Sequence, residues 1–207
     1  MPFTRRHLPH WIPEETAIFV TWRVAGSLPP RTEVIGCDRG LTDDKKRSSV
    51  PPALLRHDER LHCERSGPVW LQDSRVACVV ANALLYGETV RRYYELHAWV
   101  VMPNHIHALL QPHSEMPFVM RWLKGRTSRL ANRILGRTGK PFWQDESFDH
   151  WVRSMEELQD LIEYVEYNPV KAGMVEAKQQ WRWSSATWKT DDKMRSSVPL
   201  LPLPPTI

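Results

Sequence analysis

The sequence predicts one α+β domain, because strand-like segments alternate along the chain with segments of helical period. Runs rich in β-branched and aromatic residues lie at 17–24, 95–103 and 105–112. The last two are separated by Pro103-Asn104, which is typical of a hairpin. Helical periodicity appears at 69–94, after residue 116 and at 154–168. A chain of 207 residues with 42% hydrophobic side chains is long enough to build a substantial core.

In the N-terminal half, the first strand AIFVTWRV (17–24) ends at the breaker segment AGSLPP. Residues 28–67 are rich in proline, serine, glycine and charge, and predict a long mobile insertion. The helix at 69–94 follows this insertion. Its apolar positions are Val76, Val79, Val80, Ala83 and Leu84.

In the C-terminal half, the segment after Met116 predicts a helix that is interrupted near Gly125. Residues 141–153 predict a further strand or strand pair. The final helix begins at a capping box at Ser154 and ends at Asn168-Pro169, where proline disfavours further helix. We expect residues 1–188 to form the domain and the Pro-rich segment 189–207 to be a disordered tail.

Two histidines, His105 and His107, lie one residue apart in the run WVVMPNHIHALLQP (99–112). Side chains alternate along a strand, so both imidazoles point to one face and Ile106 points to the other. Their ring centres are expected roughly 6–7 Å apart, which allows both to bind one metal ion. Partly buried histidines that hydrogen-bond to their neighbours would explain the pair equally well.

The final helix carries two tyrosines that its buried stripe distinguishes. The stripe consists of Leu158, Leu161, Ile162 and Val165. At about 100° per residue, Tyr164 lies at the border of this stripe, and Asn168 lies one turn further on the same border. Tyr167 points to the far side. Tyr164 and Asn168 can therefore both face whatever the helix packs on.

The histidine pair, Tyr164 and Asn168 form a set suited to attack on a phosphodiester. A phenol with a pKa of about 10 is a poor nucleophile at neutral pH. The attack therefore needs a cation that polarises the phosphate and favours the phenolate. Two imidazoles and one amide oxygen leave coordination positions open for a phosphate oxygen and water.

Positive charge is concentrated in one segment, although the net charge is only +4. Residues 116–140 contain seven basic side chains and no acidic one. The candidate DNA-binding residues among them are Arg121, Lys124, Arg126, Arg129, Arg133 and Arg137. The seventh basic residue of the segment is Lys140. Such a block indicates a polyanion partner, and a solvated basic helix face is the alternative.

The remaining composition favours a cytoplasmic protein without membrane contact. The apolar runs are too short to span a bilayer, and the N-terminus lacks the apolar region of a signal peptide. The three cysteines are odd in number and form no CxxC pair, so free thiols are expected.

Three motifs in this order resemble the REP-associated tyrosine transposases, a branch of the HUH single-strand transposases. MPNHIHALL (102–110) resembles the family's histidine strand. YVEYNPVKAGMV (164–175) resembles its tyrosine helix and following turn, and FWQDESFDHWVR (142–153) resembles the segment before that helix. The resemblance extends from about Trp11 to Trp188.

The resemblance implies an antiparallel sheet with helices packed on one side, a ferredoxin-like or RRM-like HUH core. It implies that His105, His107 and Asn168 hold a divalent ion, Mg²⁺ or Mn²⁺, and imidazole ligands favour Mn²⁺. Tyr164 is then the nucleophile that cuts single-stranded or hairpin DNA at palindromic sequences, leaving a 5′-phosphotyrosine and a free 3′-OH. The protein would act as a monomer or homodimer, with Tyr164 working in its own subunit or a partner's.

Asp149 and His150 lie in the segment before the tyrosine helix and are candidates for a supporting role. They would either hydrogen-bond to the metal ligands or contact DNA.

Two other functions remain open from the sequence. The first is a catalytically idle DNA-hairpin-binding protein on the same fold, although Tyr164 and the three candidate ligands are all present. The second is a zinc-dependent hydrolase in which His105 and His107 bind zinc and water is the nucleophile. That function needs a third histidine or carboxylate ligand, which the sequence does not place.

Overall fold

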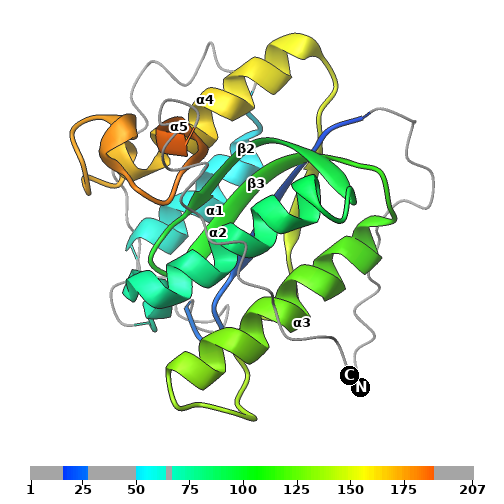
Figure 1. Ribbon diagram of the computed structural model, residues 1–207. Coiled ribbons are helices and arrows are strands. Elements are labelled where there is room, and N and C mark those ends of the chain that lie inside the picture. Colours follow the sequence, from blue (N-terminus) through cyan, green and yellow to red (C-terminus); the bar gives the residue numbers. More distant parts are fainter. Residues whose placement is uncertain (1–15, 28–49, 64–66, 189–207) are drawn as a thin grey trace, which may run out of the picture.

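The computed structural model describes residues 16–27, 50–63 and 67–188 (Figure 1). The predicted tail at 189–207 and most of the predicted insertion lie outside the described residues. The described part of the chain forms an antiparallel sheet with helices packed on it, which confirms the predicted fold class. No helix within this part combines the length and the apolar character needed to cross a membrane.

The sheet has four strands, which are β1 (Ile18–Arg23), β2 (Tyr94–Val101), β3 (His105–Pro112) and β4 (Phe148–Trp151). Their spatial order is β2-β3-β1-β4. The helices are α1 (Pro52–Cys63), α2 (Ser74–Thr89), α3 (Met116–Ile134), α4 (Met155–Lys171) and α5 (Ser185–Trp188). Two single turns, η2 (Trp70–Gln72) and η3 (Lys178–Gln180), complete the described elements.

The predicted hairpin places the histidines in the middle of the sheet. β2 and β3 pair antiparallel on either side of Pro103-Asn104, as expected. β3 also pairs with β1, with His107 opposite Thr21 and His105 opposite Arg23. A central strand has its backbone groups bonded on both sides, so it fixes the direction of its side chains firmly.

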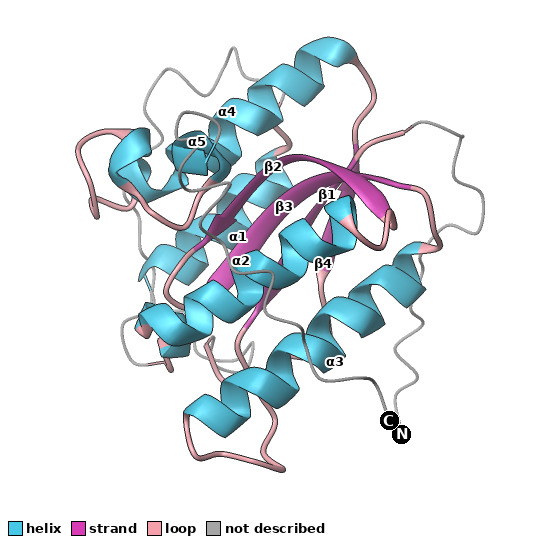
Figure 2. Ribbon diagram, in the orientation of Figure 1, coloured by secondary structure: helices cyan, strands magenta, loops and turns pink. Residues whose placement is uncertain are grey.

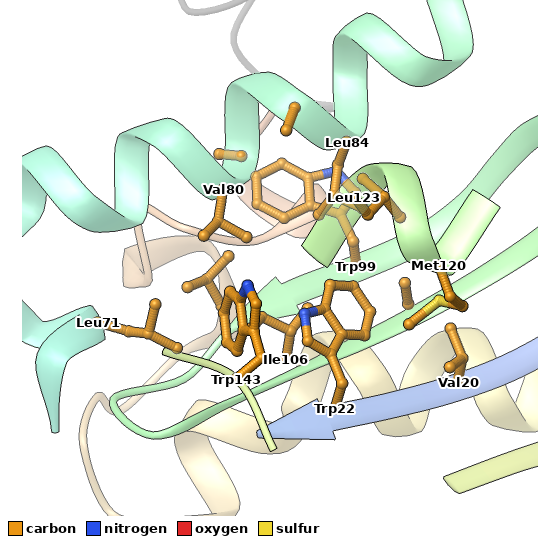
Figure 3. Packing of buried hydrophobic residues seen from close by; sticks show 14 of the residues in the cluster. Val20, Trp22, Leu71, Val80, Leu84, Trp99, Ile106, Met120, Leu123 and Trp143 are labelled. Carbon is orange, nitrogen blue, oxygen red and sulfur yellow. The ribbon is translucent and has the colours of Figure 1, made fainter. Parts of the chain in front are cut away.

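Helices cover both faces of the sheet, so the expectation of helices on one side was wrong (Figure 2). On one face, Val20, Trp22 and Ile106 pack with residues of α2 and α3 (Figure 3). On the other face, Phe19 and Leu109 pack with residues of α1 and α4. Since β1 and β3 carry apolar side chains in both directions, each face has to be covered.

The helix α1 lies in the segment 28–67, where the sequence predicted a mobile insertion and no regular element. Pro52 is its first residue, a position where the missing amide proton of proline costs nothing. Leu54 and Leu61 are buried on one face of the helix. The short amphipathic pattern was obscured by the proline- and charge-rich residues on either side.

Two other helices are longer than predicted. α3 continues through Gly125 without interruption, because Val119, Leu123 and Ala131 are buried along its whole length. α4 continues through Pro169 to Lys171 rather than ending at Asn168. Packing against the sheet therefore outweighs the local preferences of glycine and proline.

We expect Gly87→Ala and Gly125→Ala to change stability in opposite directions, although both glycines lie in helices. A Cβ at Gly87 would lie 2.2 Å from the hydroxyl of Tyr94, which is buried and donates to the Leu84 carbonyl. This overpacking should cost about 1–3 kcal/mol. A Cβ at Gly125 meets no atom within 4 Å, so alanine there should stabilise by about 0.5–1 kcal/mol. Urea denaturation measures the free energy of unfolding of each variant, and changes of the same sign in the two variants would contradict the prediction.

Candidate metal and tyrosine site

His105 and His107 point to the same face of β3, as the strand alternation predicted, while Ile106 is buried on the other face. Their Nε2 atoms face each other at 3.1 Å, and both side chains are fully buried. The ring centroids are 4.7 Å apart, closer than expected, because the two rings lean toward each other. Two converging Nε2 atoms are the arrangement that a shared ion requires.

The other ring nitrogens are held by neighbouring side chains. His105 Nδ1 lies 2.6 Å from Asn104 Oδ1, and the amide of Asn104 is oriented by its Nδ2, which donates to the Leu61 carbonyl. His105 therefore donates from Nδ1 and keeps the lone pair of Nε2 for the site. His107 Nδ1 lies 2.7 Å from the Thr21 hydroxyl. Such partners orient metal-binding imidazoles.

A buried carboxylate, Asp58, completes a group that the sequence did not predict. Its Oδ1 lies 3.0 Å from His107 Nε2 and 3.4 Å from His105 Nε2. Asp58 occupies the apolar face of α1 between Leu54 and Leu61, at helical spacing. A charged residue on an apolar stripe was the signal that could have identified it.

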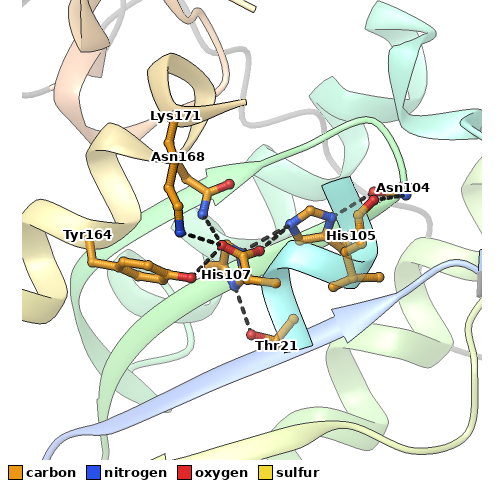
Figure 4. A network of polar contacts seen from close by, with 9 residues as sticks. Thr21, Asn104, His105, His107, Tyr164, Asn168 and Lys171 are labelled. Atoms are coloured by element: carbon orange, nitrogen blue, oxygen red, sulfur yellow. Dashed lines mark hydrogen bonds and ion pairs between the residues drawn. The ribbon is translucent and has the colours of Figure 1, made fainter. Parts of the chain in front are cut away.

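Three residues of α4 reach the second oxygen of this carboxylate (Figure 4). The Tyr164 hydroxyl donates to Asp58 Oδ2, and Asn168 Nδ2 donates to the same atom at 2.8 Å. Lys171 Nζ lies 3.9 Å from it. Tyr167 is 50% exposed on the far side of the helix, as the helical wheel predicted.

The environment of Tyr164 favours the protonated phenol. Burial raises the pKa of its hydroxyl well above 10, and the negative charge of Asp58 and the hydrogen bond to it raise this pKa further. Removal of the Asp58 carboxylate, or a positive charge in its place, would lower the pKa of the Tyr164 hydroxyl.

The donor set fits a divalent transition-metal ion. Asp58, His105 and His107 offer a carboxylate oxygen and two imidazole nitrogens, all within 4.8 Å of one another. Imidazole with carboxylate suits manganese or zinc better than magnesium. Asn168 turns its amide nitrogen toward Asp58, and a half-turn of that amide would offer the oxygen instead. Its assignment as a ligand stays a prediction.

Of the basic residues predicted to bind DNA, three are engaged within the protein. Lys124 Nζ donates to the carbonyls of Gln144 and Asp145, at 3.1 and 3.0 Å. The guanidinium of Arg126 lies over the ring of Tyr86, and that of Arg137 lies 3.9 Å from the centroid of Trp70. The positive charges of these three residues thus contact loop carbonyls and aromatic rings of the protein itself.

The other three predicted DNA-binding residues, Arg121, Arg129 and Arg133, are exposed on α3. α3 packs on the face of the sheet opposite to His105 and His107. The structure thus brings the histidines, Tyr164 and Asn168 together, but it does not bring the basic helix to them.

His150 lies in β4, close to the first turn of α4. Its Nε2 is 2.8 Å from the carboxylate of Glu157, which also accepts from the Arg153 amide. Burial raises the pKa of the neighbouring Asp149. These contacts fasten β4 to the first turn of α4, and a supporting role of Asp149 and His150 in the site stays a prediction.

Comparison with known proteins finds similarity to transposases. Residues 82–168 match the family described as "Transposase IS200 like". The chain is 29% identical over 96 residues to the REP-associated tyrosine transposase of Escherichia coli (strain K12), covering 45% of this chain and 55% of that protein. A second curated relative, a putative REP-associated tyrosine transposase from Haemophilus influenzae, is 30% identical over 112 residues, which cover 48% of this chain and 64% of that protein. The chain thus spans less than two thirds of the length of either relative.

The fold is also similar to a solved structure, that of a REP-associated tyrosine transposase bound to a REP hairpin. The TM-score is 0.54 at 18% identity, over 92% of this chain and 86% of the other. At this identity the likeness concerns the fold. Together with the sequence matches, it confirms the resemblance predicted from the three motifs.

Proposed function

We propose that this chain, which resembles the REP-associated tyrosine transposases in sequence and fold, cuts and rejoins single-stranded DNA at hairpin-forming sequences. The observation that carries the proposal is the convergence of Tyr164 with His105 and His107 on one buried carboxylate. A tyrosine nucleophile and a metal-binding pair have to meet at one phosphate, and these residues come from α4 and β3.

In the proposed reaction, the phenol oxygen of Tyr164 attacks the scissile phosphorus. The O–P bond to tyrosine forms, the P–O3′ bond breaks, and the proton lost by the phenol is balanced by the proton gained by the 3′ oxygen. The products are a 5′-phosphotyrosine and a free 3′-OH, so attack by a 3′-OH on the phosphotyrosine rejoins the strand. No external energy source is needed, because one phosphodiester is exchanged for another.

His105 and His107 would hold the divalent ion through Nε2, with Asn168 as a further candidate ligand, and Asp58 would be a ligand only while no phosphate occupies the site. When bound, the ion would polarise the phosphate and stabilise its developing charge. Asn104 and Thr21 keep the two imidazoles in orientation through their Nδ1 atoms.

A direct experiment is to incubate the protein with Mn²⁺ and a pool of labelled, single-stranded hairpin oligonucleotides whose flanks are randomised. A denaturing gel then separates covalent protein–DNA adducts, and sequencing of the bound strands identifies the target. Adduct that needs Mn²⁺ supports the proposal. Free cleavage products without any adduct would contradict it.

The exposed arginines of α3 are proposed to bind the phosphates of the substrate away from the cleavage site. Changing Arg121, Arg129 and Arg133 together to glutamine should weaken binding to all single strands alike. The log–log slope of affinity against salt should fall by up to about 0.7 for each phosphate that the protein no longer neutralises. Fluorescence anisotropy at several salt concentrations measures the slope, with Arg153→Gln, an exposed arginine between β4 and α4, as control. An unchanged slope would show that the three arginines form only a solvated face.

A metal-dependent hydrolase with water as nucleophile is the second candidate function. Asp58 supplies the third ligand that the zinc hypothesis lacked, next to His105 and His107. The two candidates differ in their need for Tyr164: hydrolysis by water would survive its replacement by phenylalanine, whereas strand exchange would not.

A further inference from the structure

Three side chains on one face of α4 converge on a single oxygen, Oδ2 of Asp58. The hydroxyl of Tyr164 and the amide of Asn168 donate to it, and the ammonium of Lys171 lies 3.9 Å away. These residues are spaced i, i+4 and i+7, so the helix itself sets their common direction. Two donors and a cation around one anionic oxygen constitute an anion-binding site.

The two oxygens of the Asp58 carboxylate contact different elements of the site. Oδ1 faces the Nε2 atoms of His105 and His107, while Oδ2 faces α4. A phosphodiester carries its two free oxygens on one phosphorus, so it can present them in the same two directions. We propose that Asp58 occupies the position of the scissile phosphate, and that Lys171 is the residue that supplies positive charge to that phosphate. This inference rests on the proposed function.

Lys171 is placed to touch both the phosphate and the nucleophile. Its Nζ lies 5.0 Å from the centre of the Tyr164 ring, and its side chain is 32% exposed. The charge therefore sits beside the phenol at the border between the buried site and solvent. Asp58 is 1% exposed, so the anion that Lys171 faces is largely removed from water, where such an attraction is strong.

It follows that Asp58 and the substrate phosphate compete for the same donors. A phosphate can reach Tyr164, Asn168 and Lys171 only when the carboxylate of Asp58 leaves them. Asp58 can withdraw by a change of its side-chain rotamer or by a movement of the part of α1 that carries it. The structure described here is then the state that precedes DNA binding.

Inorganic phosphate serves as the probe, in metal-free buffer, with its dissociation constant measured by calorimetry or ³¹P NMR titration. Asp58→Ala should bind phosphate at least about tenfold more tightly than the unaltered protein, because the internal competitor is gone. In the Asp58→Ala protein, the further change Lys171→Ala should weaken phosphate binding by at least about tenfold, and Lys171→Arg should retain most of the affinity. Lys140 is exposed on the loop after α3. Lys140→Ala removes the same charge as Lys171→Ala and should have little effect on phosphate affinity.

Asp58→Asn removes the charge at nearly constant shape, and it replaces the alanine variant if thermal melting shows that the latter does not fold. Equal phosphate affinity with and without Lys171, or equal losses for Lys171→Ala and Lys140→Ala, would overturn the inference.

The adduct assay separates this inference from the proposed function. If the unaltered protein forms the adduct and Lys171→Ala forms it at the same rate at all DNA concentrations, the inference is wrong and the function stands. If phosphate binding follows the predicted order but the unaltered protein forms no adduct, the anion site stands and the proposed function is wrong.

Discussion

Replacing Tyr164 with phenylalanine is expected to eliminate the covalent protein–DNA adduct, whereas Tyr167→Phe should leave it intact. Tyr164 directs its hydroxyl into the site, onto Asp58, and Tyr167 is half exposed on the opposite side of α4. Loss of a nucleophile should lower the rate by at least about 10⁴-fold. A gel assay of adduct and mass spectrometry of the nuclease-digested complex measure the outcome.

The same substitution also has an expected structural cost. Tyr164→Phe removes a hydrogen bond to a buried carboxylate, so it should destabilise the protein by about 1.5–3 kcal/mol. A chemical denaturation curve is needed to confirm that the variant is folded at the assay temperature. A nucleotide recovered on Tyr167, or on neither tyrosine, would refute the assignment of the nucleophile.

The second large effect is expected from His105→Ala and His107→Ala, each of which should abolish cleavage while leaving most of the DNA affinity. Affinity comes chiefly from phosphate contacts, which these buried imidazoles do not need to make. Removal of a ligand should weaken Mn²⁺ binding by more than about 100-fold, beyond the loss typical of residues that only orient a ligand. Electron paramagnetic resonance of free Mn²⁺ measures this affinity without any assay of activity.

His113→Ala provides the matched control, because His113 is exposed just beyond the end of β3. It should change neither Mn²⁺ affinity nor cleavage. Normal cleavage by the His105→Ala/His107→Ala double variant would exclude a histidine-bound metal from the reaction.

The residues that sequence reasoning located correctly are those governed by local periodicity. The two-residue period of β3 gave both histidines one direction, and the 3.6-residue period of α4 separated Tyr164 from Tyr167. Neither inference needed knowledge of what lies across the sheet.

Asp58 could not be located in this way, because its role depends on a contact across a long stretch of sequence. It lies 49 residues before His107 and 106 before Tyr164. Only the packing of α1 on the sheet brings it to the site, and that packing begins within a segment whose composition predicts a loop. Lys171 lies outside the predicted site for a related reason, since the sequence predicts that the helix ends before Pro169, whereas α4 continues to Lys171.

The placement of α3 and the tyrosine site on opposite faces of one sheet makes the molecule two-sided. Under the proposed function, a strand held by the exposed arginines would have to pass around an edge of the sheet before its scissile bond meets Tyr164. DNA binding and strand cleavage would then depend on separate surfaces, which lie on opposite faces of the sheet. Under the proposed function, changes of the α3 arginines would alter affinity for all single strands while the residues of the cleavage site stay unchanged, and short oligonucleotides should engage one surface without the other.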